Sequence, residues 1–255
     1  MSKVTAIVLA GSRPGNDSFA EAYGTNLKAL IPVSGVPMVR RPVDALLASD
    51  EVGAVHVLAQ QPERIAEVLP AHPKLSVHVS GGSIAATLEA YCFDSAVQWP
   101  LLVTTADHAL LDGEMIEDFC ALAKHADLAI GVVERRALRH RLPQAERTWI
   151  RLRGGAYSGA NLFMLGSRKV VPALELWRSV EQDRKKVATL LWALGPAAFL
   201  GAMLRLRTID QTLDRVGRRL GMTIRAVELA DPLAAVDVDK QADKLLVEAI
   251  LEGRE

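Results

Sequence analysis

Short apolar runs alternate with helical patterns through the first two-thirds of the chain. The runs expected to form strands are Val4–Ala10, Ala54–Ala59, Leu75–Val79, Leu101–Thr105 and Leu128–Glu134. The segments expected to form helices between them are Val39–Ser49, Pro62–Leu69, Ile84–Val97 and Glu114–His125. Strands and helices that alternate over this length predict a mainly parallel sheet with helices on both faces, which is the α/β class.

The last third of the chain follows a different pattern. It holds two expected strands, a long and mostly helical segment, a further strand and a terminal helix, which are Thr148–Arg153, Asn161–Leu165, Ser167–Leu220, Thr223–Leu229 and Lys240–Leu251. We therefore expect a three-layer α/β/α sandwich whose mainly parallel sheet has an antiparallel excursion, with a helical subdomain at about 167–221. Because 255 residues suffice for a sizeable core, we expect one domain over residues 1–255.

Charge and cysteine content narrow the class of protein. The 30 basic residues (Lys and Arg) balance the 30 acidic ones (Asp and Glu), so no overall field favours nucleic acid as a partner. Cys92 and Cys120 are too few for a disulfide framework and lack metal-ligand spacing, so we expect buried thiols in a reducing compartment. The sequence enters an apolar strand without the apolar core and cleavage site of a signal peptide, so we expect a cytoplasmic protein.

Residues 187–204 contain no charged side chain, although basic residues stand on both sides of them. Gly195 and Pro196 divide the segment near its middle, where proline disrupts helical hydrogen bonding. Two short apolar helices that form a hairpin, buried or in a homodimer interface, are therefore favoured over a membrane span. Docking on an anionic membrane surface is the main alternative, because the flanking basic residues suit it.

The first expected strand runs into a glycine-bearing turn, Leu-Ala-Gly-Ser-Arg-Pro-Gly over residues 9–15. Glycine lets the backbone bend sharply, and the unpaired N–H groups of such a turn suit a phosphate chain. Arg13 and Lys28 supply cations that a triphosphate needs. The nucleotide-binding residues expected here are Leu9, Ala10, Gly11, Ser12 and Gly15. A plain turn with solvated basic residues explains the turn alone equally well.

The turn and the segment Lys-x-Leu-x-Pro-Val-x-Gly-x-Pro-Met over residues 28–38 together resemble a family signature. It is that of the molybdenum-cofactor-guanylyltransferase-like NTP transferases, which are related to cytidylyltransferases and sugar-phosphate nucleotidyltransferases. The family usually has two adjacent glycines and a shorter loop, whereas here Ser12 follows Gly11. The resemblance implies the GT-A-like nucleotidyltransferase fold, an NTP substrate and Mg²⁺ as cofactor, with Arg13 and Lys28 as catalytic residues.

Three aspartates are candidates for the metal site. Asp107 follows the expected strand Leu101–Thr105, where a carboxylate faces the ligand crevice of a parallel sheet, and it matches the family's metal-binding aspartate. Asp239 resembles a metal residue of the family's C-terminal motif, and Asp237 points to the same face if the chain is extended. The alternatives are a turn-forming or capping role for Asp107 and a cap on the last helix for Asp239.

A second glycine turn leads into an expected helix and consists of Gly81, Gly82, Ser83 and, one turn on, Thr87. The spacing i, i+4 puts the hydroxyls of Ser83 and Thr87 on one helical face, where they can bond the edge of a base. The resemblance to the base-recognition segment of cytidylyl- and guanylyltransferases supports nucleotide binding. An N-terminal cap formed by Ser83, with a solvated Thr87, is weighed equally.

The segment Tyr157–Asn161 resembles the family's substrate-side motif, which implies that Gly159 and Asn161 hold the second substrate. Turn chemistry explains these residues nearly as well. Lys185 and Lys186 belong to the nearest basic cluster in the sequence. They are candidates for binding the phosphate of the second substrate, although a solvated face is slightly favoured.

The function implied is transfer of a nucleotidyl group from an NTP, with CTP or GTP favoured, to a phosphorylated small molecule, with release of pyrophosphate. A nucleotide-sugar glycosyltransferase is an alternative on the same fold, but Ala109 stands where its second metal carboxylate is usual. A non-catalytic nucleotide-binding protein docked on a membrane is the alternative from another class. The chain lacks Walker A, Gly-x-Gly-x-x-Gly and Gly-x-Ser-x-Gly patterns, which disfavours other nucleotide folds and triad hydrolysis.

Overall fold

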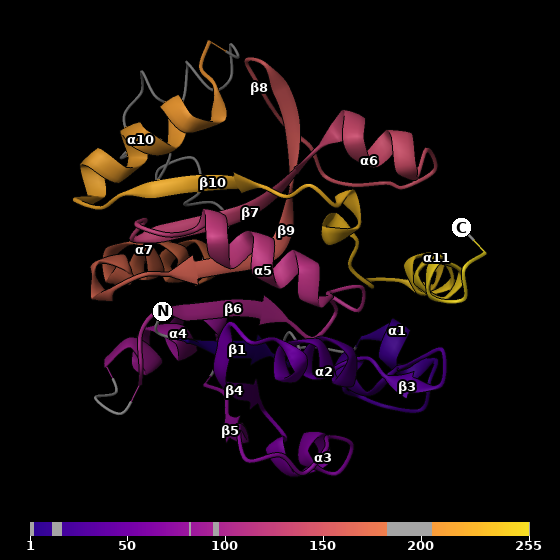
Figure 1. Cartoon of the computed structure of the whole chain (residues 1–255). Coiled ribbons are helices and arrows are strands. Elements are labelled where there is room, and N and C mark those ends of the chain that lie inside the picture. Colours follow the sequence, from indigo (N-terminus) through magenta and orange to yellow (C-terminus); the bar gives the residue numbers. More distant parts are fainter. Residues whose placement is uncertain (1–2, 12–16, 82, 94–96, 183–205, 255) are drawn as a thin grey trace.

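The computed structural model describes residues 3–11, 17–81, 83–93, 97–182 and 206–254. Within these ranges one eight-stranded sheet has the order β10-β7-β9-β6-β1-β4-β5, and β8 pairs with β9 outside that path (Figure 1). Its strands are β1 Val4–Leu9, β4 Val52–Ala59, β5 Leu75–Val79, β6 Leu101–Thr105, β7 Leu128–Glu134, β8 Ile150–Leu152, β9 Gly155–Leu165 and β10 Ile224–Glu228. Only the pairs made by β9 are antiparallel among these strands, which confirms the mainly parallel sheet with an antiparallel excursion.

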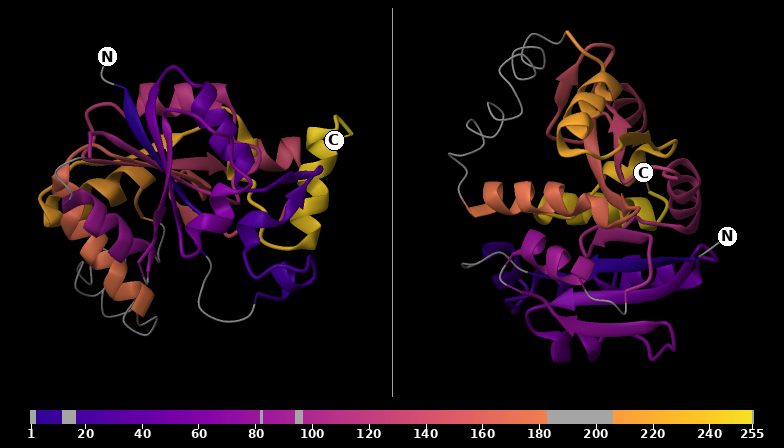
Figure 2. Two further views of the ribbon diagram at one scale, coloured as in Figure 1. Left: turned by 90° about the horizontal axis from the view of Figure 1, so that it is seen from below. Right: turned by 90° about the vertical axis from the view of Figure 1, so that its left-hand side faces the viewer.

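Helices cover both faces of this sheet and complete the three layers (Figure 2). The described α-helices are α1 Ser18–Glu21, α2 Arg40–Ala48, α3 Pro62–Ala66, α4 Ile84–Phe93, α5 Gly113–Leu122, α6 Arg135–Arg141, α7 Val171–Gln182, α10 Ile209–Leu220 and α11 Gln241–Leu251. One apolar core lies under α2 and α5 and holds Leu46 and Phe119, both fully buried. The other lies under α4 and α7 and holds Leu88 and Leu174. The three-layer α/β/α class is thereby confirmed.

The segment after β7 differs most from expectation. Residues 135–141 form the helix α6, which the sequence analysis did not predict, because Leu138 is the helix's one buried apolar residue among basic neighbours. Strand β9 begins at Gly155 and not at Asn161, so Ser158 and Gly159 lie inside a strand. The turn before β9 lies at Arg153 and Gly154, and Gly154 has φ +95°.

The long helical segment expected over 167–220 is seen at its two ends. Helix α7 packs against α4, and Leu213 and Val216 of α10 pack on the same core. Both helices are therefore part of a layer of the sandwich. Lys185, Lys186 and the apolar residues 187–204 lie outside the described residues, so their predicted roles stay predictions. None of the helices that the structure does describe is both long and apolar enough to cross a membrane.

Asp127, at the start of β7, ties two distant segments to the sheet. Its Oδ2 accepts hydrogen bonds from the Thr223 backbone N (2.8 Å) and Oγ1 (2.9 Å), and its Oδ1 accepts one from Ser167 Oγ (3.1 Å). The bond from the Thr223 backbone is the main cause that lowers the pKa of Asp127 below its usual 3.8.

We expect Asp127→Asn to lower the free energy of unfolding by about 1–3 kcal/mol at pH 7, because it weakens charge-assisted hydrogen bonds. The pKa of Asp127 is depressed in the folded state, so this stabilisation exists above pH 3.8 and is lost as the pH falls through the folded-state pKa. Urea unfolding at pH 7 and below pH 3.8 measures both effects. Asp118→Asn, on the exposed face of α5, is the matched control and should change neither value. A difference that persists in acid would contradict the assignment.

Candidate functional site

The predicted phosphate turn and Asp107 lie next to each other at the carboxyl ends of two central strands. Leu9 of β1 pairs in register with Thr105 of β6, and the Ala106 backbone N donates to Leu9 O at 3.0 Å. Leu9, Ala10 and Gly11 therefore approach Asp107 at the edge where parallel sheets bind ligands. Ser12, Arg13 and Gly15 lie outside the described residues, so their proposed roles are not placed.

Lys28 is positioned by a compact segment that packs on the last helix. It begins the 3₁₀ turn η1 (Lys28–Leu30), which is followed by the two-stranded hairpin β2 (Pro32–Val33) and β3 (Val36–Pro37). Ser34 and Gly35 have φ +45° and +75°, the positive values that a tight hairpin turn requires. The Ser34 backbone N donates to Glu248 Oε1 of α11 at 2.7 Å, so Lys28 is held against the C-terminal segment.

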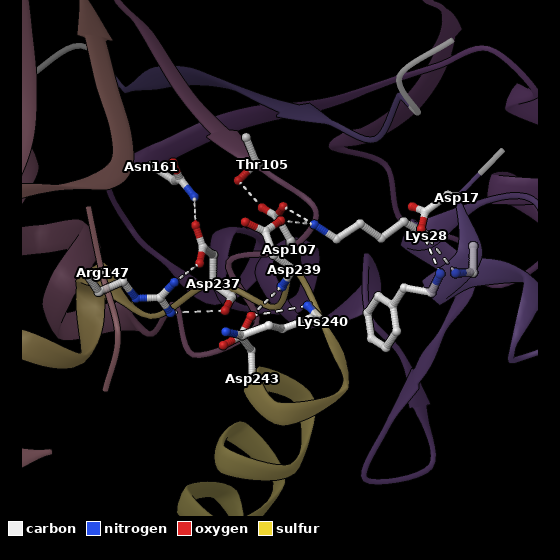
Figure 3. Close-up of polar contacts among 12 residues, drawn as sticks. Asp17, Lys28, Thr105, Asp107, Arg147, Asn161, Asp237, Asp239, Lys240 and Asp243 are labelled. Atoms are coloured by element: carbon white, nitrogen blue, oxygen red, sulfur yellow. Dashed lines mark hydrogen bonds and ion pairs between the residues drawn. The ribbon is translucent and has the colours of Figure 1, made fainter. Parts of the chain in front are cut away.

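Two carboxylates from distant parts of the chain converge on the Lys28 ammonium (Figure 3). Nζ of Lys28 lies 2.7 Å from Oδ2 of Asp107 and also donates to Oδ1 of Asp239. Thr105 Oγ1 donates to the other oxygen of Asp107, and the Val238 backbone N donates to Asp107 O at 3.1 Å. The Asp239 side chain is 65% exposed, so the cluster opens to solvent.

Burial and charge act in opposite directions on Lys28. Burial alone would lower its pKa, but Asp107 and then Asp239 favour the charged form and raise the pKa above its usual 10.5. Lys28 is therefore a permanent cation at neutral pH. A cation held beside two carboxylates can neutralise charge on a ligand that displaces either of them.

The first turn of α11 is capped by Asp243 and not by Asp239. Oδ2 of Asp243 accepts from the backbone N of Asp239 and of Lys240, each at 3.1 Å. The Asp239 carboxylate, in contrast, accepts from Lys28. The alternative in which Asp239 only caps the helix therefore does not fit the structure.

Asp237 is held differently from the other two aspartates. Its Oδ1 accepts from Arg147 Nη1, its Oδ2 accepts from Asn161 Nδ2 at 3.2 Å, and its backbone O accepts from Arg147 Nη2 at 3.1 Å (Figure 3). Burial is the main cause that raises its pKa; Asp239 and Asp107 add to the rise, and Arg147 opposes it. Asp237 therefore shares the electrostatic environment of the cluster but is engaged by Arg147 and Asn161.

A bulge in β9 aims Asn161 at this site. The pairing of β7 with β9 shifts register between Ile130 and Val132, and Asn161 has φ +48°. Bulges next to functional sites redirect side chains in this way. Gly159, two residues earlier, is exposed, and a Cβ built there would meet no atom within 4 Å. The structure thus brings Asn161 to Asp237 and leaves Gly159 facing open space.

The donor set fits Mg²⁺ bound together with a nucleotide. Among the described residues no group of three His, Cys, Asp or Glu is arranged to hold a metal ion by itself. Mg²⁺, however, commonly takes only one or two carboxylates and completes its shell with phosphate oxygens and water. Asp107 and Asp239 already share one cation, the Lys28 ammonium, so a pair of carboxylates suited to a cation exists here.

His108 follows Asp107, and its side chain contacts Thr104. Its side chain is fully buried, with Nδ1 3.3 Å from Thr104 Oγ1. Burial lowers its pKa to about 4, so the ring is neutral at pH 7. We therefore assign His108 to the packing beneath the site.

The second glycine turn uses its hydroxyls locally. Thr87 is buried; its Oγ1 accepts from Gly81 N at 2.9 Å and donates to Ser83 O at 2.8 Å. Ser83 Oγ accepts from Ala86 N at 3.2 Å in the first turn of α4. These bonds match the capping alternative for Ser83, but the predicted solvated Thr87 is not found. Gly82 lies outside the described residues, and base binding by this turn stays a prediction.

Comparison with known proteins decides the family. Residues 6–222 match the MobA-like NTP transferase domain. The chain belongs to this NTP transferase family. The resemblance predicted from the signature at residues 28–38 is thereby confirmed.

Solved structures with a similar fold agree with this NTP transferase assignment. A hypothetical transferase structure from Thermus thermophilus is 30% identical, with a TM-score of 0.81 over 95% of this chain and 100% of that chain. The 4-diphosphocytidyl-2C-methyl-D-erythritol synthase of Anaerococcus prevotii DSM 20548 is 8% identical, with a TM-score of 0.60 over 98% of this chain and 96% of that one. A CMP:2-keto-3-deoxy-manno-octonic acid synthetase complexed with CTP is 14% identical, with a TM-score of 0.64 over the whole of both chains. A search of curated proteins gives no match.

Sequence reasoning missed three residues of this NTP transferase's site. Thr105 stands two residues before Asp107 on the same strand end, and that spacing could have suggested its contact with the carboxylate. Asp243 stands four residues after Asp239, a spacing that could have indicated the true cap of α11. Arg147 reaches Asp237 across 90 residues of sequence, and no local pattern marks it.

Proposed function

We propose that this NTP transferase moves a nucleotidyl group from CTP or GTP to a phosphorylated small molecule and releases pyrophosphate. The observation that carries the proposal is the convergence of Asp107 and Asp239 on Lys28 at the carboxyl ends of β1 and β6. The turn predicted to bind phosphate begins at Leu9–Gly11 and would extend from that same edge of the sheet. Two structures of similar fold have cytidyl compounds in their names, which supports a pyrimidine donor without excluding GTP.

Asp107 and Asp239 would hold the Mg²⁺, and Asp237 would contribute its charge from the adjoining position. When bound, Mg²⁺ would neutralise negative charge on the phosphate oxygens. The exposure of the Asp239 side chain, 65%, leaves room for water and nucleotide oxygens around the pair.

The residues of the chain would position the acceptor and the NTP and would stabilise negative charge during the transfer. An oxygen of the acceptor phosphate attacks the α-phosphorus of the NTP, and the bond from that phosphorus to the bridging oxygen of the β-phosphate breaks. The acceptor is already an anion, so no general base is needed. Lys28, with Arg13 and the backbone of residues 9–15, would stabilise the charge on the departing pyrophosphate.

The acceptor would lie beside Asn161 and Gly159. Asn161 is fixed by Asp237, and the open space at Gly159 leaves room for a ligand on β9. Arg147 keeps Asp237 in place and so orders this side of the site. Lys185 and Lys186 are proposed as further contacts to the acceptor phosphate.

Pyrophosphate release tests this function. The protein is incubated with each of the four NTPs and with a panel of sugar, polyol and lipid-headgroup phosphates, in Mg²⁺ and then in EDTA. We expect pyrophosphate and a nucleotidylated acceptor in equal amounts with CTP or GTP, and no reaction in EDTA. In a parallel incubation with nucleotide sugars, release of a nucleoside diphosphate would instead establish a glycosyltransferase. Binding of NTP without any turnover across the panel would favour a non-catalytic protein.

A further inference from the structure

A cavity of about 570 Å³ lies beside α10 and the turn between β8 and β9. Figure 1 shows α10 and β8 far from α11, which follows Asp239. The cavity is lined by Arg153, Leu206, Arg207, Gln211, Asp214, Arg215 and Arg218. A volume of this size is typical of small-molecule sites.

The backbone places these arginines around one cavity. The Arg153 backbone N donates to Arg207 O at 2.9 Å, which fixes the β8–β9 turn beside the chain that leads into α10. On α10, positions 211, 215 and 218 are spaced i, i+4 and i+7, so they lie on one face of the helix. Three separate segments therefore present basic side chains to one cavity.

The charges of this cavity are not balanced by its own residues. Four guanidinium groups share it with one carboxylate, that of Asp214. In the part of the chain that the structure describes, Arg153, Arg215 and Arg218 form no ion pair with a described acidic residue. Nε of Arg215 is buried without a hydrogen-bond partner there. Since the whole chain has zero net charge, this local excess of positive charge is a feature of the cavity and not of the composition.

We propose that this arginine cavity is a second ligand site that binds a phosphate-bearing anion of two or more negative charges. Planar guanidinium groups bind phosphate oxygens through paired hydrogen bonds, and several arginines around one cavity suit a diphosphate or a phosphomonoester. Asp214 would accept a hydrogen bond from a hydroxyl of the same ligand. The inference does not rest on the transfer reaction proposed above.

The same phosphate chemistry has two sources, a free phosphorylated metabolite and the headgroup of an anionic lipid. Leu206, whose side chain is 60% exposed at the edge of the cavity, would contact the acyl region in the second case. A free ligand would instead fill the cavity from solution. The experiment below separates the two.

Inorganic pyrophosphate is titrated into full-length Lys28→Ala protein in EDTA, so that the transfer site contributes little. We expect one binding event, weakened at least about tenfold by Arg153→Gln with Arg218→Gln, because charge-assisted bonds are lost. Both arginines are exposed, so folding should be retained. They come from different elements that line the same cavity, so a loss of affinity in this variant points to one ligand there. Arg136→Gln with Arg139→Gln, two exposed arginines of α6, is the control of equal charge and should change the affinity less than twofold.

Vesicles of phosphatidic acid in phosphatidylcholine form the second arm. Binding to these vesicles that Arg153→Gln with Arg218→Gln removes, while soluble pyrophosphate binds weakly, would support a lipid headgroup as the ligand. Absence of binding in both arms, or equal losses in the α6 control, would overturn the proposal. Pyrophosphate release by the transfer site is measured on the same arginine substitutions made in protein that keeps Lys28, and it should be retained with saturating substrates. Failure of the second-site proposal is therefore distinct from failure of the proposed function.

Discussion

Lys28→Ala is expected to lower kcat by about a hundredfold to a thousandfold, the effect of removing one preorganised charge donor at a transition state. Lys28 is the cation that joins Asp107 and Asp239, and it would stabilise the departing pyrophosphate. Its side chain is 20% exposed, and its partners are partly or largely exposed, so the fold should remain. Pyrophosphate release under saturating substrates measures kcat, and thermal unfolding measures the effect on stability.

Lys3→Ala is the matched control for this substitution. Lys3 is an exposed lysine directly before β1, at the end of the strand away from the site, so its loss removes the same charge without touching the cluster. The control should retain the kcat of the wild type. An unchanged kcat in folded Lys28→Ala protein would rule out the role assigned to this lysine.

Asp107→Asn should reduce kcat by about a hundredfold or more and raise the Mg²⁺ concentration needed for half-maximal rate, because a neutral amide is a poorer ligand for Mg²⁺. The amide keeps the size of the carboxylate, and the backbone bond from Val238 N to Asp107 O does not depend on the side chain. The fold is therefore expected to persist. Rates measured across a Mg²⁺ titration separate a loss of metal affinity from a loss of turnover.

Asp50→Asn controls for the removal of one negative charge. Asp50 is exposed just before β4, at the amino ends of the parallel strands. Its variant should show the wild-type Mg²⁺ dependence. If Asp107→Asn also kept the wild-type dependence and rate, Asp107 would not be a metal residue.

The central strands β1 and β6 could be predicted from sequence because they are buried almost throughout and read as mostly apolar runs. Leu75–Val79 and Leu101–Thr105 form with the predicted bounds. Lys28 and Asp107 could be proposed as site residues for a related reason, since a signature segment and the end of a central strand are both local features. Their direct contact at 2.7 Å brings η1 to the carboxyl end of β6.

What the sequence left open depends on contacts between distant residues. Arg147 and Asn161 matter because they meet Asp237, and the bulge that turns Asn161 toward it arises from the pairing of β7 with β9. Helix α6 has one buried apolar residue, Leu138, which gives little periodic signal. The sequence also left open which of Asp239 and Asp243 caps α11, because either residue could do so. In the structure Asp243 forms the cap and Asp239 accepts from Lys28.

The most direct test is a crystal structure of the protein with Mg²⁺ and a CTP analogue that cannot be cleaved between the α- and β-phosphates. We predict that the triphosphate lies between Gly11 and Lys28, with Mg²⁺ bound by Asp107 and Asp239 and the α-phosphate open toward Asn161. A nucleotide bound elsewhere, or at this edge with neither aspartate on the metal, would contradict the assignment of this site to nucleotidyl transfer.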